Sequence, residues 1–133
     1  MINTIRHLLS AGELAGIWDA PLIGARRHPT WYPIFASEAR TVDHLTNQAV
    51  AVVAGRGDNA WLTGLATRIS RPDDYAEAAA TLAELRAYGA LLEAGFNVKP
   101  IPVSDDSTPD FEIDAGDGSI IVEVFAKHED KKE

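Results

Sequence analysis

A long helical segment in the middle of the chain is followed directly by sequence that is typical of β-strands. The helix is predicted to begin at Ser70-Arg71-Pro72-Asp73, where a capping residue, a proline and acidic residues follow one another. It extends to about Ala94 and ends at Gly95, a residue favoured at helix ends. A glycine on its apolar face predicts close packing against another backbone. That face is formed by Ala78, Leu82, Leu85, Gly89 and Leu92.

Three short strands are predicted after the helix. The first covers Phe96 to Ile101, and the second covers Asp110 to Asp114. Asp117-Gly118 is a hairpin turn signal, and Ser119 to Ala126 is rich in β-branched residues. The expected fold is therefore α/β, with one helix leading into a three-stranded antiparallel meander.

The first part of the chain is predicted to be helical. Helices are expected over residues 2–18, from Ser37 to Gly55, and from Asp58 onward. Three prolines argue against regular structure from Asp19 to Ala36. We therefore divide the chain into a helical N-terminal region, residues 1–72, and a second part, residues 73–133.

Charge is distributed unevenly between these two parts. Residues 1–72 carry seven Arg and Lys against five Asp and Glu, a net charge of +2. Residues 73–133 carry five against fifteen, a net charge of −10. This asymmetry suits a protein that contacts phosphates with one part and binds cations with the other. The candidate phosphate contacts are Arg26, Arg27, Arg56 and Arg68.

The chain has no cysteine and no apolar segment long enough for a membrane span. Disulfides and thiolate metal sites are therefore excluded. We expect a cytoplasmic protein that does not associate with membranes.

Four segments in order resemble the PD-(D/E)xK, or restriction-endonuclease-like, nuclease superfamily. The first two are Ala83-Glu84-Leu85 in the long helix and Glu93-Ala94-Gly95-Phe96-Asn97-Val98 after it. The others are Thr108-Pro109-Asp110-Phe111-Glu112-Ile113, similar to the Pro-Asp element, and Ile120-Ile121-Val122-Glu123-Val124, similar to the strand with the second acid. The resemblance covers residues 73–127.

This resemblance implies a metal-dependent nuclease that hydrolyses phosphodiesters in DNA. Glu84, Asp110 and Glu123 would hold Mg²⁺ or Mn²⁺, because hard cations prefer carboxylate oxygens. A hairpin with its turn near Gly118 would place Asp110 opposite Glu123 on one face. Asp110 and Glu123 would act in catalysis together with Lys127. The family usually has lysine two positions after the second acid, where this chain has Phe125.

Two alternatives remain open at the level of sequence. A nuclease-like scaffold without the usual lysine could serve as an inactive protein-binding or nucleic-acid-binding module. Alternatively, Gly55-x-Gly57-x-x-Ala60 after an apolar segment could be the phosphate-binding turn of a dinucleotide-binding protein.

The family core is also incomplete in this sequence. It continues with another helix and strand, and only a few residues follow the third strand here. We expect a longer polypeptide or a second copy, as in a homodimer, to complete the sheet.

Overall fold

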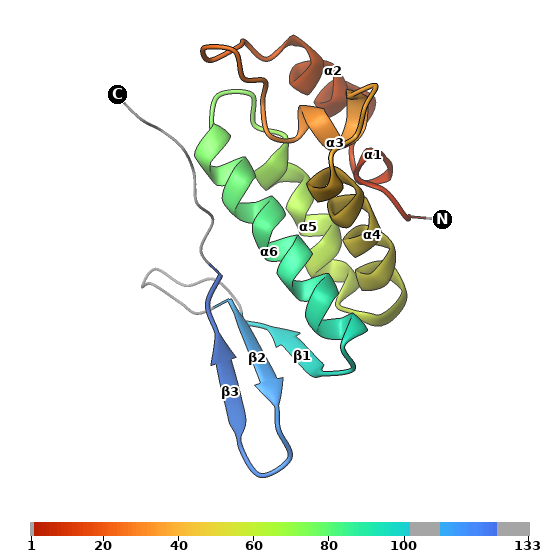
Figure 1. The fold of residues 1–133 in the computed structure, drawn as a ribbon, viewed down its shortest axis with the longest axis vertical. Helices are drawn as coiled ribbons and strands as arrows, with labels where there is room; N and C mark the ends of the chain where they lie inside the picture. The colour runs from red at the N-terminus through yellow and green to blue at the C-terminus, as the bar shows by residue number, and fades with distance from the viewer. Residues whose placement is uncertain (1, 102–109, 125–133) are drawn as a thin grey trace.

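In residues 2–101 and 110–124, which a computed structural model describes, six helices precede a three-stranded antiparallel sheet (Figure 1). The sheet lies at one end of the helical layer and continues directly from its longest helix. The mixed α/β class and the order of helices before strands are therefore as predicted. The helices are α1 (Ile5–Leu8), α2 (Ala11–Asp19), α3 (Trp31–Phe35), α4 (Thr41–Arg56), α5 (Asn59–Ile69) and α6 (Tyr75–Glu93). The strands are β1 (Asn97–Pro100), β2 (Phe111–Asp114) and β3 (Ser119–Val122).

Helix α6 is the predicted long helix, with both ends fixed by local hydrogen bonds. At its start, Asp74 rather than Ser70 is the cap, and its carboxylate accepts from the Glu77 N–H at 3.0 Å. At its end, Gly95 has a φ of +94°, and the Phe96 N–H donates to the Leu91 carbonyl at 3.2 Å. The Gly95 N–H donates to the Leu92 carbonyl at 3.0 Å, which completes a Schellman motif. This motif turns the chain from α6 into β1.

Helices α4 and α6 approach each other closely at one glycine. A Cβ atom added at Gly89 would lie 2.8 Å from the Ala49 Cβ and 2.9 Å from the Ala49 Cα. Only a residue without a side chain fits there, because the opposing atoms include backbone. The predicted close packing at Gly89 is confirmed.

The N-terminal region differs from the prediction in three places. The single helix expected over residues 2–18 is two helices, because Ser10 and Glu13 form a capping box that starts α2. The proline-rich loop contains α3, where Pro33 occupies a first-turn position at which its missing N–H costs nothing. Helix α4 starts at Thr41 instead of Ser37, since the Asp43 carboxylate accepts from the Arg40 N–H at 2.9 Å.

The dinucleotide-binding alternative is wrong at its first element. Residues 49–54 are part of α4, so no strand precedes the glycines. Gly57 ends α4, and Asp58 caps α5 by accepting from the Trp61 N–H at 3.0 Å. The glycine-rich segment is a connection between two helices, and α5 begins where the sequence predicted.

The sheet is a meander in the order β1-β2-β3, with Val98 opposite Ile113 and Ile113 opposite Ile120. It docks on the helices through Phe111, whose ring lies 5.0 Å from that of Tyr88 and 5.7 Å from that of Trp61. Strand β3 is less covered, and the residues Ile120 and Ile121 are both 53% exposed. The sheet is therefore anchored through β1 and β2.

One hydrophobic core joins the helices to the sheet. It includes Ile17 and Val50 from the first 72 residues, and Leu85, Val98 and Phe111 from the remainder. Within residues 2–101 and 110–124, no helix combines the length and the apolar content that crossing a membrane requires.

The α4–α6 contact can be tested with a pair of glycine substitutions. Gly89→Ala should lower the free energy of unfolding by about 1–3 kcal/mol, because the added methyl group meets the Ala49 backbone. Gly64→Ala is the control, since that glycine is exposed in α5 with nothing within 4 Å of an added Cβ. It should stabilise the protein by up to about 1 kcal/mol through helix propensity. Urea unfolding measures the free energy of unfolding of both variants. Equal changes in the two variants would contradict the close contact at Gly89.

Candidate functional site

Glu84 lies in the middle of helix α6. Its side chain is only 15% exposed, and its Oε2 lies 3.3 Å from Nη2 of Arg68 in the last turn of α5. A carboxylate this far from water needs a partner that compensates for lost hydration. Arg68 is that partner.

Arg68 connects two acids on the same face of α6. Its Nε donates to Oε2 of Glu77 at 2.8 Å, while its Nη2 faces Glu84. Glu77 and Glu84 are seven residues apart, or about two helical turns, so their side chains point in the same direction. The Arg68 guanidinium is therefore held between two carboxylates.

Asp110 is placed by an irregularity at the start of β2. Its N–H donates to the Val122 carbonyl on β3 at 3.0 Å, while its own carbonyl accepts from the Ile101 N–H on the β1 side at 2.9 Å. In a regular strand both backbone groups of one residue point to the same neighbouring strand. The alternation of faces is therefore broken at Asp110. Its Oδ2 accepts from the Val124 N–H at 2.7 Å, which fixes the side chain.

The two carboxylates of Glu84 and Asp110 are close enough to affect each other. Burial raises the pKa of Glu84 above its ordinary value, and the negative charges of Asp110 and Glu77 raise it further. The ion pair with Arg68 opposes this rise but does not cancel it. Two of the three predicted metal ligands thus influence each other electrostatically.

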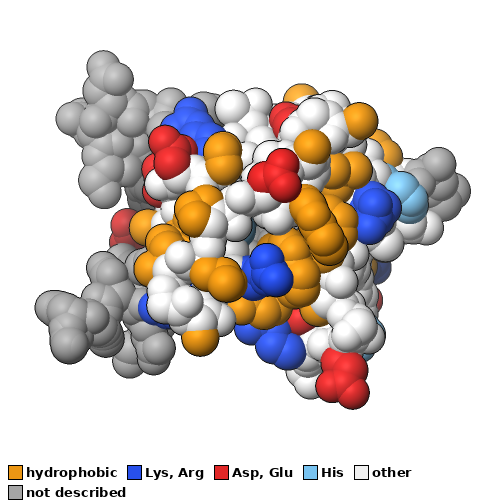
Figure 2. Space-filling model, turned by 90° about the horizontal axis from the view of Figure 1, so that it is seen from above, with side chains coloured by type: hydrophobic (Ala, Val, Ile, Leu, Met, Phe, Trp, Pro, Cys, Tyr) orange, Lys and Arg blue, Asp and Glu red, His pale blue; other side chains and the backbone are white. Residues whose placement is uncertain are grey.

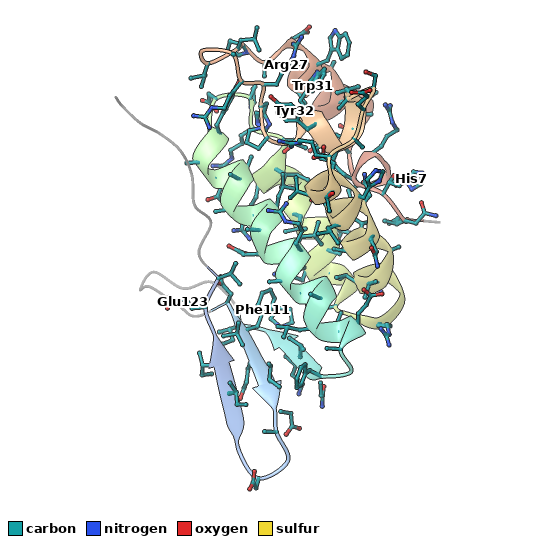
Figure 3. All side chains as sticks on the ribbon, viewed as in Figure 1. His7, Arg27, Trp31, Tyr32, Phe111 and Glu123 are labelled. Atoms are coloured by element: carbon teal, nitrogen blue, oxygen red, sulfur yellow. The ribbon has the colours of Figure 1, made fainter. Side chains whose placement is uncertain are left out.

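Glu123 does not join them. The regular pairing of β2 with β3 ends at Phe111–Val122, and beyond it the Asp110 N–H donates to the Val122 carbonyl, so the predicted pairing of Asp110 with Glu123 is not established. Val122 and Val124 pack against the core, so Glu123 between them is exposed on the other face (Figure 3). The expectation that Asp110 and Glu123 share a face is wrong, because Asp110 departs from the regular alternation.

Other predicted site residues lie apart from this pair. Lys127 and Phe125 are outside the described residues. Arg26 and Arg27 lie in the loop before α3, and Arg56 ends α4. Within the part of the chain that the structure describes, no three His, Cys, Asp or Glu side chains are grouped as metal ligands would be.

Sequence reasoning missed the pairing of Arg68 with α6. It assigned Arg68 to phosphate contact and gave Glu77 no role. The spacing of Glu77 and Glu84 was a signal for a shared partner, because two turns separate them on one helix face. Which basic side chain lies opposite the two acids depends on how α5 packs against α6. The spacing of the acids alone could not predict that.

The chain was compared with protein-family models, curated proteins and solved structures, and none of them matches it.

The burial of Glu84 predicts a pH-dependent stability. Because the folded-state pKa lies above the ordinary value of 4.5, the native state holds this proton more tightly than the unfolded chain does. Stability contributed by Glu84 is present below pH 4.5 and is lost as the pH rises through that value and through the raised pKa. Glu84→Gln removes this titration, so its stability relative to the wild type should increase with pH.

Urea unfolding of both proteins over a pH series measures this difference. Glu112→Gln on β2 is the matched control, because it also removes one negative charge. A stability difference for Glu84→Gln that stays constant with pH, after correction by the control, would contradict the assignment.

Proposed function

We propose that this chain contributes the metal-binding part of a nuclease that hydrolyses phosphodiesters in DNA. The observation that carries the proposal is that the largely buried Glu84 carboxylate, paired with Arg68, is near enough to Asp110 for the Asp110 charge to raise its pKa. These acids belong to two of the segments that resemble the PD-(D/E)xK superfamily. They come from a helix and a strand that are distant in sequence, and their mutual repulsion calls for a compensating cation.

The donor set suits a hard divalent cation. Magnesium is commonly held by one or two carboxylates and completes its coordination with water and substrate phosphates. Glu84 and Asp110 provide two carboxylates, and carboxylate oxygens suit Mn²⁺ equally. A metal ion bound there would neutralise charge on the phosphoryl oxygens and lower the pKa of attacking water.

The surrounding residues would then have distinct roles. Glu84 would exchange its contact with Arg68 for the cation. Arg68, still held by Glu77, would present its free N–H groups to a phosphate oxygen, where charge develops during the reaction. Lys127 is a further candidate for stabilising that charge.

An inactive binding module is the second candidate function. It is favoured by the exposure of Glu123 on the opposite face and by Phe125 at the usual lysine position. Such a module would keep the helix and meander as a scaffold for nucleic acid or protein without cleaving DNA.

Titration with Mg²⁺ and a DNA cleavage assay test the proposal together. Mg²⁺ should raise the melting temperature of the wild type, since a ligand that binds only the native state stabilises it. Glu84→Gln and Asp110→Asn should abolish this rise and reduce DNA cleavage by about 100-fold or more. Asp110→Asn retains an oxygen that can accept from the Val124 N–H, so the local fold should persist.

Two controls separate the candidate functions. Asp117→Asn, an acid-to-amide change in the exposed turn between β2 and β3, should leave both readouts unchanged. Glu123→Gln should still show the rise in melting temperature with Mg²⁺, because the proposed site uses only the carboxylates of Glu84 and Asp110. A Mg²⁺ effect without cleavage in any variant would favour the inactive module, and equal cleavage by wild type and Asp110→Asn would reject the site.

A further inference from the structure

A pocket of about 500 Å³ lies on a different face of α6 from Glu84. Its walls come from the loop before α3, from α3 and the start of α4, and from Tyr75, Ala79, Leu82 and Arg86 on α6. Arg86 is two residues after Glu84, which corresponds to about 200° around the helix. The volume falls within the range of small-molecule sites, roughly 300–1,000 Å³. The pocket is therefore separate from the acidic pair.

The pocket is strongly basic in an acidic protein. Among the described residues, four arginines line it, Arg26, Arg27, Arg40 and Arg86, together with one carboxylate, Asp43. Its formal charge is therefore four minus one, or +3, while the whole chain carries −8. From the end of the molecule farthest from the sheet, Lys and Arg side chains lie among hydrophobic ones (Figure 2). Such a pocket favours a multiply charged anion over a single carboxylate.

Arg86 has no ion-pair partner among the described residues. Its Nη1 donates to the Thr46 hydroxyl at 2.9 Å. Burial lowers its pKa, and the more distant Asp43 carboxylate offsets this only in part. Within the described part of the chain, Arg86 donates only this one side-chain hydrogen bond, to Thr46, out of five guanidinium N–H groups.

The loop that contributes Arg26, Arg27 and Pro29 to the pocket is fixed by hydrogen bonds of His28 and Thr30, which flank Pro29. The His28 Nδ1 accepts from the Thr30 N–H at 3.1 Å, so its Nε2 carries the proton and donates to the Arg71 carbonyl at 2.7 Å. The Thr30 hydroxyl donates to the Ile69 carbonyl at 2.7 Å. These bonds tie the arginine-bearing loop to the end of α5. A preformed wall reduces the entropy lost when a ligand binds.

Flat groups already stack at this site. The Arg40 guanidinium lies 4.1 Å from the centre of the Tyr32 ring and is held by two hydrogen bonds to Asp43. The Arg27 guanidinium lies 4.6 Å from the Trp31 ring (Figure 3). Guanidinium planes and aromatic rings are surfaces on which nucleobases stack.

We propose that this pocket binds a small phosphate-bearing molecule with a flat ring, of the size of a nucleoside monophosphate. Arg86 and Arg40 bind the phosphate, because the planar guanidinium matches the spacing of phosphate oxygens. The ring stacks beside Tyr32 and Arg27, which both line the pocket, and contacts the apolar side chain of Leu82. The site needs no divalent cation and is independent of the proposed nuclease chemistry.

Calorimetric titration with adenosine 5′-monophosphate tests the site, with EDTA present so that metal ions cannot mediate binding. The wild type should bind this probe, and both adenosine and inorganic phosphate should bind at least about 10-fold more weakly. Arg86→Gln should weaken binding by about 10-fold or more through loss of charged hydrogen bonds. Arg56→Gln is the matched control, because Arg56 is exposed at the end of α4 and does not line the pocket.

Ala79→Leu provides a second test that keeps all four arginines. Its larger side chain fills the pocket from α6, so binding should be lost even if Arg86→Gln proves unstable. The proposal is overturned if the nucleotide binds no better than inorganic phosphate, or if Arg86→Gln and Arg56→Gln bind it equally. It is also overturned if a single-stranded oligonucleotide binds without competition from the mononucleotide, which would indicate a nucleic-acid surface.

Discussion

The contact between α4 and α6 at Ala49 and Gly89 determines where everything else can lie. Because only the Ala49 methyl group lies between the two backbones, α6 is held closely against α4 near its C-terminal end. From that position its end reaches the sheet, with Tyr88 against Phe111, while its start borders the loop before α3. A shift of α6 would disturb the helical core, the docking of the sheet and both candidate sites at once.

Helix α6 carries acidic side chains on one face and a basic side chain on another. One face carries Glu77 and Glu84 toward Arg68, and another carries Arg86 toward the basic pocket. In both places a charged group of the helix is removed from water, and in both the compensation within the protein is incomplete. The two proposals therefore assign ligands of opposite sign to the two faces, a cation beside Glu84 and an anion beside Arg86.

Local signals predicted the second part of the chain well and the first part less well. Three features act through the nearby backbone, so the sequence alone predicted their effects. They are Gly95 at the end of α6, the Asp117-Gly118 turn, and the glycine on the apolar face of α6. Glu123 could not be assigned to a face, because the break at Asp110 depends on hydrogen bonds to two neighbouring strands. The basic pocket was equally hidden, since its arginines lie up to 60 residues apart and only packing brings them together.

The meander has a consequence for the order in which the chain can fold. Strands β2 and β3 are joined by a short turn, and α6 leads directly into β1, so these contacts close small loops at little entropic cost. The contact of Phe111 with Trp61 instead spans fifty residues and requires α5 to be in place. Docking of the sheet on the helices, rather than pairing of its strands, is thus the step that depends on distant parts of the chain meeting.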